Sequence, residues 1–153
     1  MSSVEKINLM KAMYAAAVQA AHPENFIAEA VQKTLQSLPQ GRVFVTGFGK
    51  ASAVMASAFE KAAPPELKSR LEGMVIVPDG HESPTDHIQI IEAAHPVPDD
   101  RGLHAARQIF ETASQLGKDD IMVVLVSGGG SSLFCLPHPA IGFQVKQDIT
   151  TQL

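Results

Sequence analysis

Apolar positions recur along the chain in two alternating patterns. Apolar or alanine-rich segments with a spacing of three and four predict helices at residues 4–21, 26–38, 51–62, 102–116 and 145–153. Short apolar runs rich in β-branched residues predict buried strands at residues 42–46, 73–77 and 121–126, and a further strand at residues 88–92. Turns rich in proline and glycine separate these segments, so strands and helices alternate over most of the chain.

This alternation predicts an α/β fold with helices layered on a mainly parallel sheet. The link between the second and third strands has only about ten residues, fewer than the dozen or more of a parallel crossover. We therefore expect the third strand to run antiparallel or to lie at a sheet edge. The last helix reaches Leu153 without a C-cap, which suggests that the chain is a fragment of a longer protein.

Composition narrows the class of protein. A chain of 153 residues with 45% hydrophobic and 18% charged residues suits one globular domain. Its formal net charge of −4 argues against a nucleic-acid or anionic-membrane surface, which needs clustered positive charge. Cys135 is the single cysteine, so an intrachain disulfide and a cysteine-based zinc site are both excluded. No apolar run approaches the ~20 residues of a membrane span, and we expect a cytoplasmic protein.

The first candidate for chemistry is the turn after the first strand, which contains Gly47, Gly49, Lys50 and Ser52. A strand that turns through glycines into a helix presents backbone N–H groups at the positive helix end, where anions bind. The charge of Lys50 opposes the helix dipole there, and an anion would relieve that conflict. A tight turn with a solvated lysine is the alternative. The spacing is not that of a Walker A loop, and Ser52 replaces the third glycine of the dinucleotide fingerprint.

A second glycine-rich segment follows the last strand, with the sequence Ser127, Gly128, Gly129, Gly130, Ser131 and Ser132. Three successive glycines lose much backbone entropy on folding, which makes sense where the main chain approaches a ligand closely. A flexible loop is the alternative. Ser131 lacks the spacing of a nucleophile elbow and a convincing His/Asp pair. If the parent strands are parallel, both loops share one sheet edge and suit a phosphorylated ligand with a small polar partner.

A third candidate follows the third strand, at His95 and Asp99. His95 could orient or bind a substrate. Asp99 or its neighbour Asp100 could cap the next helix or hold magnesium through water. His81 is a turn residue by default, with a role in the site as the alternative. No histidine spacing supports a tight transition-metal site.

Together these segments resemble the glycerate 2-kinase family, in residues 47–52, 94–99 and 125–133 and in their order. The resemblance implies ATP-dependent phosphorylation of D-glycerate to 2-phosphoglycerate with Mg²⁺. It also implies a Rossmann-like N-terminal domain in a three-layer α/β/α arrangement, present here only in part at residues 1–153, and a second α/β domain absent from this chain. Members also carry the names hydroxypyruvate reductase and tartrate-utilisation protein, but the chain shows no dinucleotide fingerprint for a reductase.

The resemblance also assigns roles. Lys50 takes the place of the family's proposed active-site lysine. The expected substrate- and nucleotide-binding residues are Gly47, Gly49, Ser52, His95, Asp99, Ser127, Gly128, Gly129, Gly130, Ser131 and Ser132. Which loop holds which ligand is left open, as is a homo-oligomeric state. The chain departs from the family's usual pattern at Ser132, where alanine is common, and at residues 134–135, where leucines are common.

We therefore expect half an active site here and no turnover by this piece alone. The alternatives are a phosphosugar-binding module of the sugar-isomerase type and a non-catalytic interaction domain. Binding of a sugar phosphate but not ATP would favour the first alternative, and aggregation or obligate dimerisation without ligand affinity the second.

Overall fold

The computed structural model describes residues 1–35 and 40–152. The elements in chain order are α1 Ser3–Ala20, α2 Glu24–Thr34, β1 Val43–Phe48, α3 Ser52–Ala62, α4 Pro65–Lys68, β2 Leu71–Pro78, β3 Ile88–Ala93, α5 Asp100–Ser114, β4 Ile121–Val126, α6 Gly130–Leu133 and α7 Phe143–Gln152. Every predicted helix and strand is therefore present. The predicted end of the second helix and part of the following turn fall on residues 36–39, outside the described residues.

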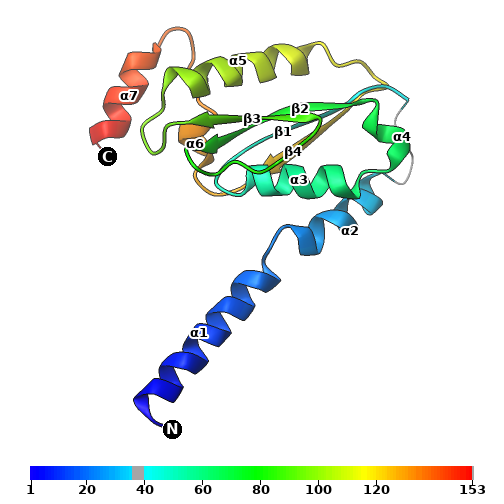
Figure 1. The fold of residues 1–153 in the computed structure, drawn as a ribbon. Helices are drawn as coiled ribbons and strands as arrows, with labels where there is room; N and C mark the ends of the chain where they lie inside the picture. The colour runs from blue at the N-terminus through cyan, green and yellow to red at the C-terminus, as the bar shows by residue number, and fades with distance from the viewer. Residues whose placement is uncertain (36–39, 153) are drawn as a thin grey trace.

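The four strands form one parallel sheet in the order β3-β2-β1-β4. Helices α2 and α3 cover one face, where Ile27, Val31 and Phe59 pack against Val45 and Val75. Helix α5 covers the other face with a second cluster of buried residues. Figure 1 shows the sheet between α5 and α3, and the predicted three-layer α/β/α arrangement is confirmed.

Strand β3 lies at one edge of the sheet and runs parallel to β2. The edge position was expected, but the antiparallel alternative is wrong. The short link at residues 79–87 makes the parallel crossover without a helix. At the end of the link, the carboxylate of Glu60 accepts hydrogen bonds from the backbone N–H groups of Asp86, His87 and the first β3 residue, Ile88, at 2.7 Å each.

Strand β4 forms the other edge, and the prediction that it is fully buried is wrong. Leu125 faces α3 and is buried, whereas Met122, Val124 and Val126 on the opposite face are 40%, 47% and 56% exposed. The reason is that one helix on this face does not cover all four strands. Helix α5 packs over β2 and β3 and leaves the outermost strand uncovered on that side.

Helix α1 begins with a capping box at Ser2 and Glu5 and extends away from the body of the molecule (Figure 1). Its predicted apolar stripe is therefore not buried: none of its residues is buried, and Met10 and Tyr14 are 61% and 74% exposed. Among the described residues, no helix combines the length and the hydropathy needed to cross a membrane.

Candidate functional site

The two glycine-rich loops lie side by side at one edge of the sheet. They follow β1 and β4, which are parallel neighbours with Phe48 in register with Val126. Backbone hydrogen bonds connect the loops directly, from Ser127 N–H to Phe48 O at 3.1 Å and from Lys50 N–H to Gly128 O at 3.0 Å. The shared edge expected from the sequence is confirmed.

The first loop is closed by its own hydrogen bonds. The N–H groups of Gly49, Lys50 and Ser52 donate to Ile76 O, Gly128 O and Gly49 O at 3.0–3.2 Å, and that of Ala51 donates to Ser127 Oγ at 3.0 Å. The N–H groups of residues 49–52 therefore already have partners. The expectation that this turn offers free amides to an anion does not hold for these four residues, because the neighbouring loop accepts two of their hydrogens.

The glycines of this loop are required by close packing. A Cβ on Gly47 would overlap the carbonyl oxygen of Leu125, and one on Gly49 would overlap the hydroxyl of Ser127. Gly49 also has a positive φ of 122°. Gly47 thus lets β1 approach β4 closely, and Gly49 lets the first loop contact the second.

The second loop, in contrast, keeps unused donors. The N–H groups of Gly128, Gly129 and Gly130 have no hydrogen-bond acceptor in the part of the chain that the structure describes. Gly129 adopts a left-handed conformation with φ 88°. Successive free amides in such a loop are the usual way in which main chain binds an oxyanion.

The hydroxyls beside these glycines differ in their surroundings. Ser132 is buried and its Oγ lies 3.3 Å from Gly129 O, to which it donates, whereas Ser131 is exposed. The rings of Phe48 and Phe134 stack with centroids 5.0 Å apart, and a Cβ on Gly130 would overlap the Phe48 ring. Phe134, which departs from the leucine expected at this position, therefore takes part in the packing of the loop.

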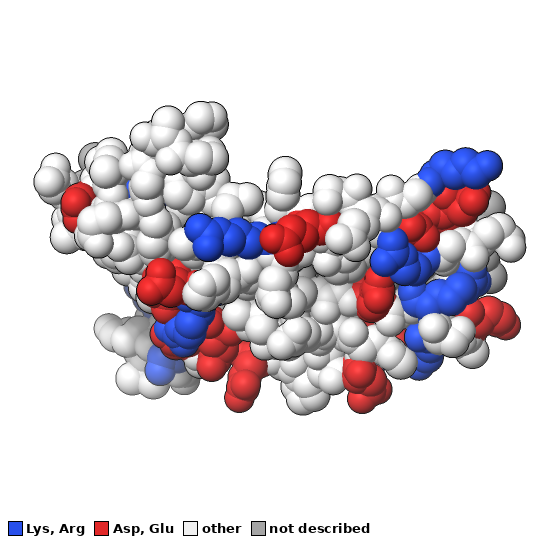
Figure 2. Space-filling model, turned by 90° about the horizontal axis from the view of Figure 1, so that it is seen from above, with Lys and Arg blue, Asp and Glu red and all other residues white. Residues whose placement is uncertain are grey.

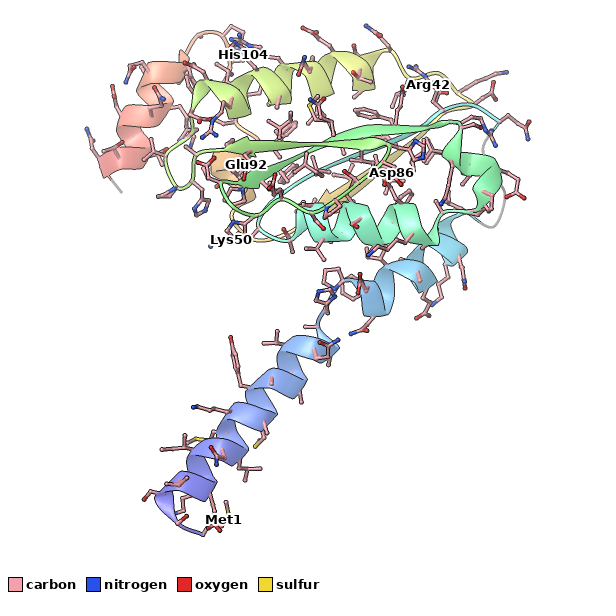
Figure 3. The ribbon with its side chains drawn as sticks, viewed as in Figure 1. Met1, Arg42, Lys50, Asp86, Glu92 and His104 are labelled. Carbon is pink, nitrogen blue, oxygen red and sulfur yellow. The ribbon has the colours of Figure 1, made fainter. Side chains whose placement is uncertain are left out.

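Lys50 and His95 converge on Gly129. A Cβ placed on Gly129 would lie 2.8 Å from His95 Nε2 and 3.6 Å from Lys50 Cε. Lys50 is exposed and pairs with no carboxylate among the described residues. Figure 3 shows Lys50 and Glu92 at the same end of the sheet. Three segments that are far apart in the sequence thus bring an unpaired cation, an imidazole and free amides together.

Asp99 caps helix α5. Its Oδ1 accepts a hydrogen bond from Gly102 N–H at 3.1 Å and its Oδ2 accepts one from Arg101 Nε at 2.6 Å. Arg101 also binds Asp79 through both carboxylate oxygens, at 2.6 and 3.0 Å. The capping alternative is thus confirmed.

Both carboxyls are held ionised. Burial alone would raise the pKa of Asp99, but the hydrogen bonds from Gly102 and Arg101 together lower it. The hydrogen bond from Arg101 likewise lowers the pKa of Asp79. This arginine bridge could not be predicted from local sequence patterns, because its two carboxylate partners are 20 residues apart, at positions 79 and 99.

The described residues do not build a metal centre. No group of three or more His, Cys, Asp or Glu side chains among them is arranged to hold an ion, and both oxygens of Asp99 are already engaged. Asp99, which could have held magnesium, is thus occupied, and the described residues do not by themselves hold Mg²⁺.

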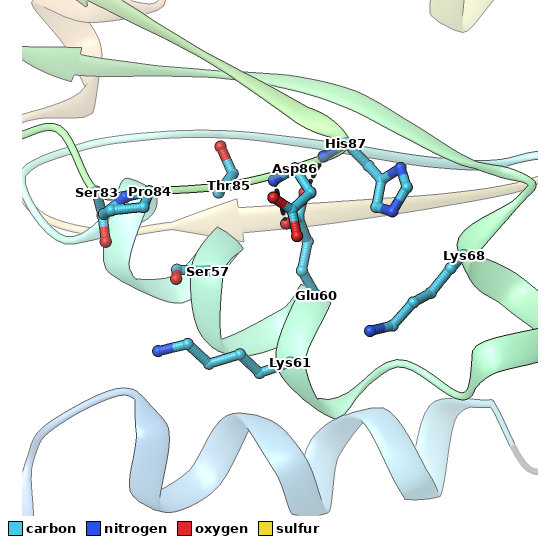
Figure 4. Close-up of a pocket in the computed structure, with 9 residues that line it drawn as sticks. All are labelled: Ser57, Glu60, Lys61, Lys68, Ser83, Pro84, Thr85, Asp86 and His87. Carbon is cyan, nitrogen blue, oxygen red and sulfur yellow. Dashed lines mark hydrogen bonds between the residues drawn. The ribbon is translucent and has the colours of Figure 1, made fainter.

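A cavity of about 430 Å³ lies away from these loops, near α4 and the start of β3. Its walls include Glu60, Lys61, Lys68 and Asp86, and none of the predicted site residues lines it. Figure 4 shows Glu60 reaching up to the backbone of the link that precedes β3. Burial of Glu60 was missed in the sequence, although its spacing from Ala53 and Ala56 places it on the inner face of α3.

The molecular surface carries charges of both signs. On the face shown in Figure 2, acidic and basic side chains are interspersed, with no broad patch of one sign.

Fold and loops together define a Rossmann-like α/β domain with two glycine-rich loops at the carboxyl edge of a parallel sheet. The model of the DUF4147 family, a domain of unknown function, matches residues 9–153. The chain therefore belongs to the DUF4147 family.

Relatives connect this family with glycerate kinases. The chain is 37% identical over 129 residues to the D-glycerate 2-kinase of Thermotoga maritima, covering 84% of the chain and 30% of that protein. It is 43% identical over 152 residues to an Agrobacterium vitis protein with the provisional name hydroxypyruvate reductase, covering 99% of the chain and 33% of that protein. The predicted resemblance to glycerate 2-kinases is confirmed.

A solved structure agrees. The crystal structure of the glycerate kinase of Thermotoga maritima superposes with a TM-score of 0.72 and 34% sequence identity, covering 90% of the chain and 32% of that protein. The chain thus spans about a third of the length of these relatives.

Proposed function

We propose that the protein containing this chain transfers the γ-phosphoryl group of ATP to the 2-hydroxyl group of D-glycerate, and that this chain supplies one side of the active site. The observation that carries the proposal is the convergence of Lys50 and His95 on Gly129, in a loop with three free N–H groups. The kinase names of the relatives supply the reaction.

The arrangement suits phosphoryl transfer because that reaction depends on positioning and charge neutralisation more than on covalent help from the protein. The amides of residues 128–130 bind an oxyanion through short, fixed donors. The ammonium of Lys50 approaches the same anion from the first loop and offsets the charge of the transferred group. The hydroxyls of Ser131 and Ser132 flank the amides.

The reaction forms one bond and breaks one. The hydroxyl oxygen of glycerate bonds to the γ-phosphorus of ATP, the bond from that phosphorus to the β,γ-bridging oxygen breaks, and ADP leaves. The hydroxyl proton passes to a base, for which His95 is the candidate at this edge of the sheet. ATP arrives as its magnesium complex, so the ion is part of the substrate.

The remaining site residues hold this arrangement in place. Gly47 allows β1 to approach β4, Gly49 allows the first loop to contact the second, and Asp99 starts α5 directly after the segment that carries His95. We further propose that residues 1–153 alone do not turn over glycerate, because phosphoryl transfer needs an enclosed site and this edge carries only half of one. A cytoplasmic location, where ATP is available, fits the proposal.

The decisive experiment measures ADP formation by the protein expressed from the complete reading frame that contains residues 1–153. D-glycerate should stimulate ADP formation and yield 2-phosphoglycerate, and Lys50→Ala should lower the rate by orders of magnitude. Lys118→Ala is the control, since Lys118 is also exposed but lies beyond α5. Reduction of hydroxypyruvate by NADH or NADPH without glycerate-dependent ADP formation would contradict the proposal, as would binding of a sugar phosphate but not ATP.

A further inference from the structure

Two serine hydroxyls join the glycine-rich loops. Ser127 Oγ accepts a hydrogen bond from Ala51 N–H at 3.0 Å and lies 3.4 Å from Ser52 Oγ. Ser52 Oγ in turn lies 3.1 Å from the carbonyl oxygen of Leu125. Ser52 is completely buried at the first turn of α3, so this chain of hydrogen bonds runs beneath the edge that carries Lys50.

The direction of these hydrogen bonds follows from counting protons. A serine hydroxyl has one proton to donate, and a carbonyl oxygen can only accept. The contact between Ser52 and Leu125 therefore uses the proton of Ser52. At the 3.4 Å contact between the two hydroxyls, only Ser127 can then be the donor. The Ser52 hydroxyl therefore has no proton left for a ligand.

The serine chain and the backbone contacts together fix Lys50. The N–H of Lys50 donates to Gly128 O, and the N–H of the next residue, Ala51, donates to Ser127 Oγ. The main chain of Lys50 is thus held to the second loop on both sides. A Cβ on Gly49 would overlap the Ser127 hydroxyl, so the two loops are also in close contact at this point.

We propose that Ser127 and Ser52 are positioning residues that lock Lys50 in register with the free amides of residues 128–130, so that both face one phosphate-type oxyanion. The identity of the oxyanion rests on the function proposed above. The lock itself rests only on the hydrogen bonds between the loops. Ser127 and Ser52 therefore act on the anion through Lys50 and the amides, without contacting it.

Amide hydrogen exchange of the 153-residue chain, followed by NMR, tests the lock directly. In the unmodified chain Ala51 N–H should exchange slowly and the N–H groups of Gly128, Gly129 and Gly130 quickly. Ser127→Ala should speed exchange at Ala51 by about tenfold, whereas Ser127→Thr, which retains a hydroxyl, should preserve its protection. Ser114→Ala is the matched control, because Ser114 bonds only within its own helix end.

Titration with pyrophosphate and with ATP tests the positioning role. Ser127→Ala should weaken binding of both by about tenfold with the exchange pattern of β2 and α5 unchanged, and Ser127→Thr should restore affinity. Retained affinity despite lost protection at Ala51 would overturn the positioning role.

Two results separate this proposal from the proposed function. Rapid exchange of Ala51 in the unmodified chain would overturn the lock, and this measurement needs no variant to fold. Absence of any pyrophosphate or ATP binding by the protein from the complete reading frame would overturn the proposed function and the oxyanion role, while the exchange data would still decide whether the lock exists.

Discussion

The carboxylate of Glu60 on α3 accepts a hydrogen bond from the backbone N–H of Ile88, the first residue of β3, at 2.7 Å. The same carboxylate accepts two further hydrogen bonds from Asp86 and His87. This parallel crossover contains no helix. One buried side chain supplies the acceptors for the N–H groups at the point where the link joins the sheet.

We predict that Glu60→Ala destabilises the fold by about 2–4 kcal/mol, because it leaves up to three N–H groups near the core without an acceptor. Glu60→Gln retains one acceptor oxygen and should lose roughly half as much. Urea unfolding followed by circular dichroism measures the difference. Glu66→Ala, at an exposed position on α4, should leave the free energy of unfolding nearly unchanged. A Glu60→Ala variant as stable as Glu66→Ala would disprove the role of this carboxylate.

Gly129→Ala should abolish anion binding. The positive φ of Gly129 strains any other residue by about 1–2 kcal/mol, and the new Cβ would also press on His95 Nε2 at 2.8 Å. Gly142→Ala shows the backbone strain alone, since Gly142 has a φ of 71° and nothing within 4 Å of an added Cβ. Both variants should lose similar stability in thermal unfolding, but only Gly129→Ala should lose pyrophosphate affinity. Equal affinity in both would remove this glycine from the site.

Lys50→Ala should weaken binding of pyrophosphate by about tenfold or more, because a charge-assisted hydrogen bond to the anion is lost. Lys50→Arg should retain much of the affinity, and added salt should weaken binding to the unmodified chain more than to Lys50→Ala. Isothermal titration calorimetry at two salt concentrations measures both effects. Lys118→Ala serves again as control, and an effect as large as that of Lys50→Ala would point to general surface charge.

Acid should destabilise the protein in part through Asp120. Hydrogen bonds from the backbone N–H groups of Gly117 and Arg42, at 2.8 and 2.7 Å, and the Arg42 guanidinium lower the pKa of this carboxyl in the folded state. A lowered folded-state pKa means that its contribution to stability is fully present above the ordinary pKa of about 4. The contribution is lost as the pH falls below that value and through the folded-state pKa.

Asp120→Asn should therefore lower stability at neutral pH and make the loss of stability below about pH 4 less steep. Unfolding curves at a series of pH values measure this slope. Glu111→Gln, on the exposed surface of α5, should leave the slope unchanged. An unaltered slope in Asp120→Asn would show that other carboxyls dominate the acid response.

The sequence by itself determined the helices, the strands and the two glycine-rich loops. These features depend on local properties, because the spacing of apolar residues and the backbone freedom of glycine act within a few neighbouring residues. The capping role of Asp99 is of the same kind, since the helix that it starts follows directly. Neighbouring parallel strands also place the loops that follow them at one edge of the sheet, so the convergence of the two loops could be predicted.

Tertiary structure decided the features that join distant segments. The strand order leaves β4 at an edge with one face uncovered, although its sequence is as apolar as that of a central strand. The hydroxyl of Ser127 accepts a hydrogen bond from the N–H of Ala51. The carboxylate of Glu60 accepts three from backbone N–H groups where the link joins β3. A hydrogen bond is made or left open by whichever atom the fold brings within about 3 Å, and no local pattern records that neighbour.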